Sequence, residues 1–191
     1  MSLITLPLLF SAALLVLISS SWKVKLLALL GQYLIVVFLV GQSWPLGLSA
    51  VKGISGLMSV AILSYTQMGL ALDPASKQIS TGRPFKLFAF ILVAVLVFSI
   101  APRLITWIPG LSLEQSTAGL LLIAAGLIHI ALDSRILPTI MGLLTLFAGF
   151  ELIYSVVEIS TLLAGLLALI NLGIALVGAF LLLLPSMEPV E

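Results

Sequence analysis

Residues 136–156, ILPTIMGLLTLFAGFELIYSV, form an apolar run about as long as a helix that crosses the core of a bilayer. The run contains one ionisable residue, Glu151. Other apolar runs of similar length lie at about 3–20, 26–43, 45–65, 86–102, 116–132 and 159–184. The sequence therefore predicts an all-α integral membrane protein with about seven transmembrane helices.

The composition favours the same class. Hydrophobic residues make up 62% of the chain, charged residues only 8%, and the mean hydropathy is +1.35. Soluble domains carry about 25% charged residues, so a water-soluble fold would lack the polar surface to cover itself. The alternation typical of outer-membrane β-barrel strands is not found in the sequence.

Several partners and cofactors are excluded by what the chain lacks. The net charge of +1 gives no indication of a nucleic-acid partner. The absence of cysteine excludes thiolate-held iron–sulfur clusters, c-type haem attachment and disulfides. The single histidine, His129, cannot supply paired axial haem ligands. We therefore expect no metal, no cofactor and no catalytic residue on this chain.

Polar stretches divide the chain into four parts. The clearest break contains Asp73-Pro74 and Gly82-Arg83-Pro84, and a second irregular piece from Pro102 to Gln115 is expected at the membrane interface. The predicted parts are an N-terminal three-helix part, an inner-side loop, a fourth helix with the interfacial segment, and a C-terminal three-helix part, at 1–66, 67–85, 86–115 and 116–191.

Basic residues predict the orientation. A signal peptide carries its positive charge before the apolar core, whereas Lys23 and Lys25 follow the first run, which indicates a retained helix. With the N-terminus outside, only Arg103 lies in an outer loop. The inner side then receives Lys23, Lys25, Lys77, Arg83, Lys86 and Arg135. The positive-inside rule thus favours an outside N-terminus and an inside C-terminus.

Lys52 lies inside the third run, and a buried charge in a bilayer is costly. Its helix face also carries Ser49, Gly53, Gly56 and Ser59, small residues that would let another helix backbone approach closely. One interpretation is a lysine that snorkels to the interface. The other is a charge that faces a partner carboxylate or a polar path.

The sixth run carries a polar stripe in its outer half, made of Glu151, Tyr154, Ser155 and Glu158. Glu158 is expected at the interface, where a charge costs little. Glu151 lies deeper and is the stronger candidate for a group that exchanges protons. A structural carboxyl group, hydrogen-bonded to a neighbouring helix, remains an open alternative.

Three further features concern helix contacts. Asn171 is the one amide in a stripe of small residues on the last helix, and such amides more often join helices than conduct ions. His129 and Asp133 are four residues apart, so they could form a proton-handling pair, although a capped helix end is the preferred interpretation. Glycine pairs at a spacing of seven predict close helix contacts: Gly119 with Gly126, and Gly142 with Gly149.

The last three predicted helices resemble the small NuoK/MrpC type of subunit of complex I and of cation/proton antiporter assemblies. The resemblance rests on Asp133-Ser134-Arg135, Ile140-Met141-Gly142-Leu143, Gly149-Phe150-Glu151-Leu152 and Gly173-Ile174-Ala175-Leu176. With the added N-terminal helices, the chain is most similar to HyfE-type subunits of membrane-bound hydrogenases and formate hydrogenlyases. Lys52 then corresponds to a lysine on a helix that precedes the NuoK-like part.

The chain also departs from this family pattern. Alignment on Arg135 places the first family carboxylate at Leu144, and Glu151 lies about 10 Å further outward at the helical rise per residue. Alignment on Gly173 places the second carboxylate at Leu169 and leaves Asn171 as the nearest polar residue. The resemblance therefore implies only part of a family proton path.

The resemblance implies a subunit of a complex I-like or membrane-hydrogenase-like assembly in a bacterial or archaeal plasma membrane. Its partners would be antiporter-like and other membrane subunits, and it would line or seal a lateral proton path. The expected path residues are Glu151, Lys52, Asn171, His129 and Glu158. Two alternatives are a purely structural anchor subunit and a small stand-alone transporter.

Overall fold

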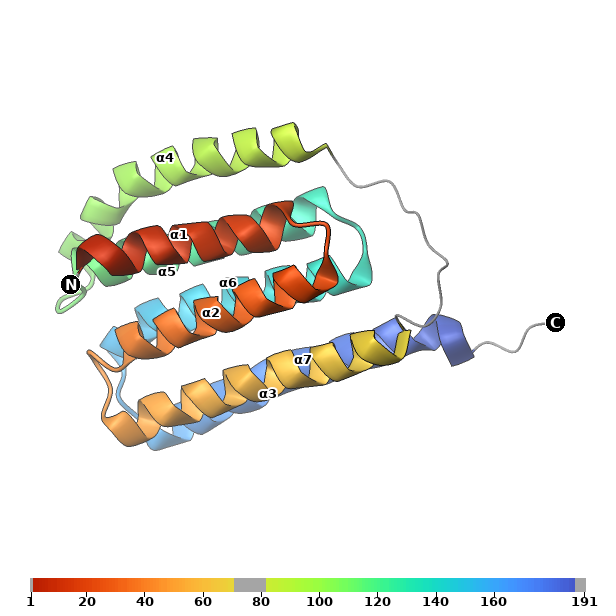
Figure 1. Cartoon of the computed structure of the whole chain (residues 1–191). Coiled ribbons are helices and arrows are strands. Elements are labelled where there is room, and N and C mark those ends of the chain that lie inside the picture. The colour runs from red at the N-terminus through yellow and green to blue at the C-terminus, as the bar shows by residue number, and fades with distance from the viewer. Residues whose placement is uncertain (1, 71–81, 188–191) are drawn as a thin grey trace.

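The computed structural model of the chain describes residues 2–70 and 82–187, and these residues form seven helices and no strand (Figure 1). The helices are α1 (Ser2–Ile18), α2 (Trp22–Val40), α3 (Leu46–Leu70), α4 (Arg83–Trp107), α5 (Leu113–Leu132), α6 (Ile136–Val157) and α7 (Thr161–Met187).

The helices form two layers of three, with α4 at one edge (Figure 1). The first layer contains α1, α2 and α3 side by side, and the second contains α5, α6 and α7. Each helix of the first layer packs on its counterpart in the second: α1 on α5, α2 on α6, and α3 on α7. Counterpart helices run in the same direction. We call the end of the bundle at which α2, α4 and α6 begin the basic end, because Lys25, Lys86 and Arg135 lie there.

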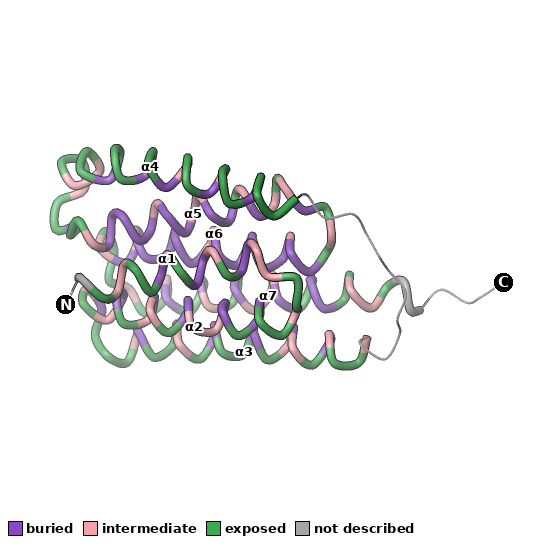
Figure 2. The backbone as a smooth tube through the Cα atoms, turned by 45° about the horizontal axis from the view of Figure 1, so that its top comes forward, coloured by how far each residue is buried: buried purple, intermediate pink, exposed green. Residues whose placement is uncertain are grey.

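Helix length and surface confirm the predicted class. Among the described residues, six helices are long and apolar enough to cross a membrane, and α1 adds a shorter apolar helix, Ile4–Ile18. Exposed residues cover the outer faces of the bundle, most of all along α4, while buried residues line the space between helices (Figure 2). Many exposed side chains are large and apolar, such as Leu27, Leu96 and Leu169. An apolar outer surface suits a lipid environment.

Several predicted boundaries were wrong by a few residues. The segment from Pro102 to Gln115 was predicted to be irregular, but most of it is helical. Helix α4 continues through Pro102 to Trp107, and α5 already begins at Leu113. Ser112 and Gln115 form a capping box that fixes this start. Only residues 108–112 are left between the two helices.

The predicted loop at 67–85 is shorter than expected on both sides. Helix α3 extends to Leu70 and α4 begins at Arg83. The middle of the predicted loop, residues 71–81, lies outside the described residues. By contrast, the predicted runs at 26–43 and 45–65 almost adjoin, and the structure also has a short connection there, since only residues 41–45 separate α2 from α3.

The glycine pairs lie at the contact between α5 and α6, as predicted. A Cβ atom placed on Gly126 would lie 2.5 Å from the carbonyl oxygen of Gly142. One placed on Gly149 would lie 2.6 Å from the carbonyl oxygen of Gly119. The two backbones therefore approach more closely than any larger residue would allow.

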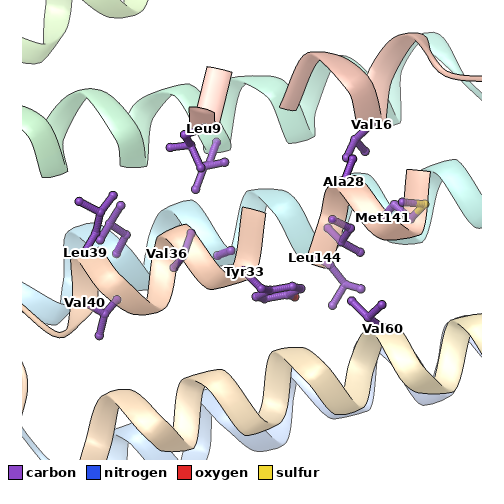
Figure 3. Close-up of a cluster of buried hydrophobic side chains, with 14 of the residues drawn as sticks. Leu9, Val16, Ala28, Tyr33, Val36, Leu39, Val40, Val60, Met141 and Leu144 are labelled. Atoms are coloured by element: carbon purple, nitrogen blue, oxygen red, sulfur yellow. The ribbon is translucent and has the colours of Figure 1, made fainter. Parts of the chain in front are cut away.

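Two clusters of buried apolar side chains hold the layers together. The smaller one joins α1, α4 and α5 and includes Phe90. The partly buried Phe10 packs against it edge to face, with 4.8 Å between the centres of the two rings. The larger one joins α1 and α2 to α5, α6 and α7, with Val60 and Leu63 from α3. Figure 3 shows Tyr33, Leu144 and Val60 of this cluster close together between their helices. The candidate site lies beside this larger cluster.

Candidate functional site

Lys52 of α3 and Glu151 of α6 form an ion pair inside the bundle. The Lys52 ammonium donates to Oε2 of Glu151, and each side chain is only 4% exposed. Each residue is six positions from its helix end at the end of the bundle opposite the basic end. The structure thus joins two residues that sequence analysis had singled out separately, and it gives Lys52 a carboxylate partner in place of a route to the interface.

A small cavity adjoins this ion pair. Its lining is otherwise apolar and comes from α2, α7 and the turn before α3: Val40, Trp44, Ala164, Leu167 and Ala168. About 10 Å³ of it is open to the centre of a water molecule, close to the minimum that one ordered water requires. Apolar surroundings strengthen the attraction between the two charges, and they also make either charge costly when it is alone.

Tyr33 of α2 lies next to the ion pair. The Lys52 ammonium is 4.9 Å from the centre of the Tyr33 ring, within the range of a cation–π contact. The Tyr33 hydroxyl donates to Oδ1 of Asn171 at 2.9 Å. Tyr33 thus connects the ion pair to the middle of α7.

Asn171 also bonds α3. Its Nδ2 donates to the hydroxyl oxygen of Ser59 at 3.2 Å, and that hydroxyl lies 2.8 Å from the carbonyl oxygen of Ser55, which it can reach as a donor. Asn171 is completely buried and its amide contacts α2 and α3 from α7. Four helices, α2, α3, α6 and α7, therefore contribute polar side chains to one buried site.

The predicted close approach of a helix backbone is found at Ser59, whose hydroxyl lies 3.3 Å from the backbone carbonyl oxygen of Asn171 on α7, but not at the two glycines of this face. A Cβ atom on Gly56 would lie 2.6 Å from Cδ1 of Tyr33, so this glycine makes room for the aromatic ring and not for a helix backbone. A Cβ atom on Gly53 would only touch Val37 at 3.5 Å. Gly56 thereby determines where the Tyr33 ring lies relative to Lys52.

Glu158 lies apart from the ion pair. It is the exposed residue that ends α6, and its backbone carbonyl accepts a hydrogen bond from the indole nitrogen of Trp44 at 3.1 Å. The structure places it at the C-terminal cap of α6, and its position at the membrane interface stays a prediction. The structure therefore separates the two glutamates of the α6 stripe.

The suggested pair of His129 and Asp133 is not formed. Both ring nitrogens of His129 are buried without a hydrogen-bond partner among the described residues. Asp133 instead accepts from Lys86 at 3.1 Å and from Nη2 and Nε of Arg135 at 2.7 and 2.8 Å. Asp133 follows the last residue of α5, as expected for a residue at a capped helix end. These contacts lie at the basic end, far along the helices from Lys52 and Glu151.

Electrostatics at the basic end keeps Asp133 charged. Burial alone would raise the pKa of Asp133, but hydrogen bonds from Arg135 and Lys86 hold this pKa well below its usual range. The same hydrogen bond with Asp133 raises the pKa of the Arg135 guanidinium. Asp133 is therefore an ionised anchor for two basic side chains.

Three buried polar residues near the middle of α2 and α6 were not predicted as site residues: Tyr33, Gln32 and Thr145. The side-chain amide of Gln32 and the hydroxyl of Thr145 have no hydrogen-bond partner among the described residues. The only available signal was the adjacent Gln32-Tyr33 inside an otherwise apolar run. A search of the described residues finds no group of three His, Cys, Asp or Glu residues that could hold a metal ion.

The site thus combines a buried ion pair, a tyrosine and an amide. Its four side chains come from four different helices. Comparison of the chain with protein-family models, with curated proteins and with solved structures finds no match.

Proposed function

We propose that this chain is a non-catalytic integral membrane subunit of a complex I-like, membrane-hydrogenase-like or antiporter-type assembly. In this proposal it contributes to a lateral proton path in a bacterial or archaeal plasma membrane, with its N-terminus outside and its C-terminus inside. Glu151 is the group that takes up and releases the proton, and Lys52 is its charge partner. The NuoK/MrpC and HyfE resemblance supports the choice of assembly.

The buried ion pair of Lys52 and Glu151 is the observation that carries this proposal. Charged residues inside membrane helices are rare, and they mark proton or ion pathways more often than residues of other kinds do. A proton added to the Glu151 carboxylate neutralises it and breaks the ion pair. Loss of that proton restores the carboxylate and the pair.

Tyr33 supports this cycle because it lies where the released ammonium needs a partner. The face of its ring is already within 4.9 Å of Lys52, and the hydrogen bond to Asn171 holds the ring in place. A cation–π contact would keep Lys52 in the site while Glu151 is neutral. Lys52 then returns to Glu151 when the proton leaves.

A second candidate function is that of a structural subunit. The observation that favours it is the linkage of α2, α3, α6 and α7 by side-chain contacts of Lys52, Glu151, Tyr33 and Asn171. Such contacts would hold the two layers in register and give partner subunits a rigid surface.

The test uses the whole assembly, isolated through a tag on this chain and reconstituted into liposomes. A potassium diffusion potential drives proton uptake, which a pH-sensitive dye inside the vesicles reports. Glu151→Gln should abolish the uptake while the assembly keeps its subunits. Glu158→Gln is the matched control. The proposal leaves Glu158 out of the path, because this exposed carboxylate at the end of the same helix lies apart from the ion pair, so the variant should leave uptake intact.

Other outcomes support the alternatives. If Glu151→Gln breaks up the assembly, and the assembly that remains takes up protons normally, the structural function is correct. If the chain purified alone drives proton uptake, it is a stand-alone transporter.

A further inference from the structure

Four charged side chains gather at the basic end of the bundle, away from the Lys52–Glu151 pair. Lys25 lies in the first turn of α2, Lys86 in the first turn of α4, and Asp133 and Arg135 in the connection between α5 and α6. Lys86 and Arg135 both donate to Oδ2 of Asp133. Lys25 is close enough to all three residues to interact with them electrostatically. We call these four residues the basic-end cluster.

The cluster has more positive than negative charge. Three cationic side chains surround one carboxylate, and Lys25, Lys86 and Asp133 are buried. Both oxygens of Asp133 are already engaged, Oδ1 by Arg135 and Oδ2 by Lys86 and Arg135. Asp133 therefore has little capacity left to compensate Lys25.

Lys25 has no side-chain hydrogen bond or ion pair with any described residue, although it is buried. The other carboxylates in the described part of the chain, Glu114, Glu151 and Glu158, lie in the opposite half of the bundle. A buried ammonium without a counter-charge is strongly unfavourable. The arrangement is therefore one that an external anion would complete.

His129 is a second buried group without a partner at this end. It lies in the last turn of α5, four residues before Asp133. It is close enough to Lys25, Lys86 and Arg135 to interact with them electrostatically. Both ring nitrogens lack a hydrogen-bond partner among the described residues. In either tautomer, one of them can donate to an anion.

We propose that the basic-end cluster binds the phosphate group of an anionic phospholipid. Lys25 supplies an ammonium, and Arg135, whose side chain is 34% exposed, connects the buried cluster to the surface of the bundle. Charge-assisted hydrogen bonds from such donors are the usual way proteins hold phosphate. Basic pockets between membrane helices at the headgroup level bind anionic lipids. In this proposal the cluster lies at the headgroup level, because its residues stand at the ends of α2, α4, α5 and α6. The apolar outer faces of these helices would accommodate the acyl chains.

The experiment measures the thermal unfolding of the delipidated full-length chain in a zwitterionic detergent, followed by tryptophan fluorescence. Phosphatidylglycerol, phosphatidylcholine and inorganic phosphate are added separately at equal concentration. At a hundredfold excess over Kd, phosphatidylglycerol should raise Tm by on the order of 5 °C. Phosphatidylcholine and inorganic phosphate should give little or no shift.

Matched variants locate the site. Lys25→Gln should lose most of the shift caused by phosphatidylglycerol, and Lys25→Arg should keep it. Lys23→Gln makes the same charge change at an exposed residue two positions away and should also keep it. Because Lys25→Gln removes an uncompensated charge, the variant should fold and, without lipid, melt no lower than the unchanged chain.

Three results would overturn the proposal. One is an equal shift with phosphatidylcholine, which would indicate a general lipid effect. Another is an equal shift with inorganic phosphate, which would assign the cluster to the free ion. The third is a full shift in Lys25→Gln, which would place the anion elsewhere.

Discussion

Lys52 and Glu151 are 99 residues apart in the sequence, yet the ammonium of one donates to the carboxylate of the other inside the bundle. The pair connects α3 of the first layer to α6 of the second, diagonally across the interface between the layers. It therefore depends on the arrangement of the layers and contributes to holding them.

Removal of one member of the ion pair should destabilise the protein more than removal of both. Lys52→Met or Glu151→Leu alone leaves an unpaired buried charge and should cost about 3–5 kcal/mol. The double variant replaces the pair by apolar side chains and should cost less than either single variant. The measurement is the free energy of unfolding in mixed micelles, from denaturant titration of all four proteins.

This double-mutant cycle contains its own control. If the losses of unfolding free energy in the two single variants add up to the loss in the double variant, Lys52 and Glu151 do not interact. That result would contradict the structure.

Loss of the Tyr33 hydroxyl should weaken the contact with Asn171. Tyr33→Phe keeps the ring against Gly56 and removes only the donor to Oδ1 of Asn171. Hydrogen bonds between membrane helices contribute about 0.6 kcal/mol on average and about 1.7 kcal/mol at most. We expect a loss of unfolding free energy in this range, measured as above.

Tyr65→Phe is the matched control, because Tyr65 is 83% exposed. It should leave the unfolding free energy unchanged within error. If Tyr33→Phe and Tyr65→Phe behave alike, the hydrogen bond to Asn171 has no energetic role.

The α5–α6 contact should not tolerate a methyl group at its closest point. Gly126→Ala places a Cβ atom 2.5 Å from the carbonyl oxygen of Gly142, and backbone cannot move away as a flexible side chain can. Overpacking of this kind costs about 1–3 kcal/mol. The expected result is a lower Tm in a thermal melt in detergent.

Gly165→Ala provides the comparison, since no described residue outside the local backbone of the same helix lies within 4 Å of the added Cβ. Alanine is the better helix former, so this variant should be equal to or more stable than the unchanged chain by about 0.5–1 kcal/mol. A Gly126→Ala variant as stable as Gly165→Ala would show that α5 and α6 are further apart than in this structure.

Acid should weaken the basic end through Asp133. Hydrogen bonds from Arg135 and Lys86 outweigh burial and keep the pKa of Asp133 below its ordinary value of 3.8. In the folded state Asp133 therefore binds its proton at a lower pH than in the unfolded state. Its contribution to stability is complete above about pH 4 and decreases as the pH falls towards the folded pKa.

The measurement is the free energy of unfolding as a function of pH between 6 and 3. Asp133→Asn removes the titrating group and should be less stable at pH 6, with a weaker fall in stability on the acid side. A variant with the same pH dependence as the unchanged chain would assign the acid sensitivity to another carboxylate.

The helices were predicted well where the sequence signal is local. The run at 136–156 differs by one residue from α6 (Ile136–Val157), because the apolar length of a spanning helix is set by the thickness of a bilayer. The start of α5 was placed three residues late, although Ser112 and Gln115 carry a capping-box pattern. The proline at position 102 predicts the end of a helix, yet α4 continues through it to Trp107.

Hydrogen-bond partners were the part that sequence could not supply. His129 and Asp133 lie at the right spacing to meet on one helix face, but Asp133 is engaged by Lys86, which comes from 47 residues earlier in the chain. The apolar run around Tyr33 does not predict that this residue belongs to a site. Tyr33 became part of the site only because Gly56 leaves room for its ring.

The amino-acid sequence alone is enough to predict a bundle of apolar helices and to show that Lys52 and Glu151 are costly to bury. Both follow from hydrophobicity, which each segment carries independently of its neighbours. The tertiary structure alone shows that these two residues meet, that Tyr33 and Asn171 accompany them, and that Lys25 has no carboxylate partner among the described residues. Such pairings depend on which helices are neighbours and how each is rotated, and close packing at glycines such as Gly56 and Gly126 determines both.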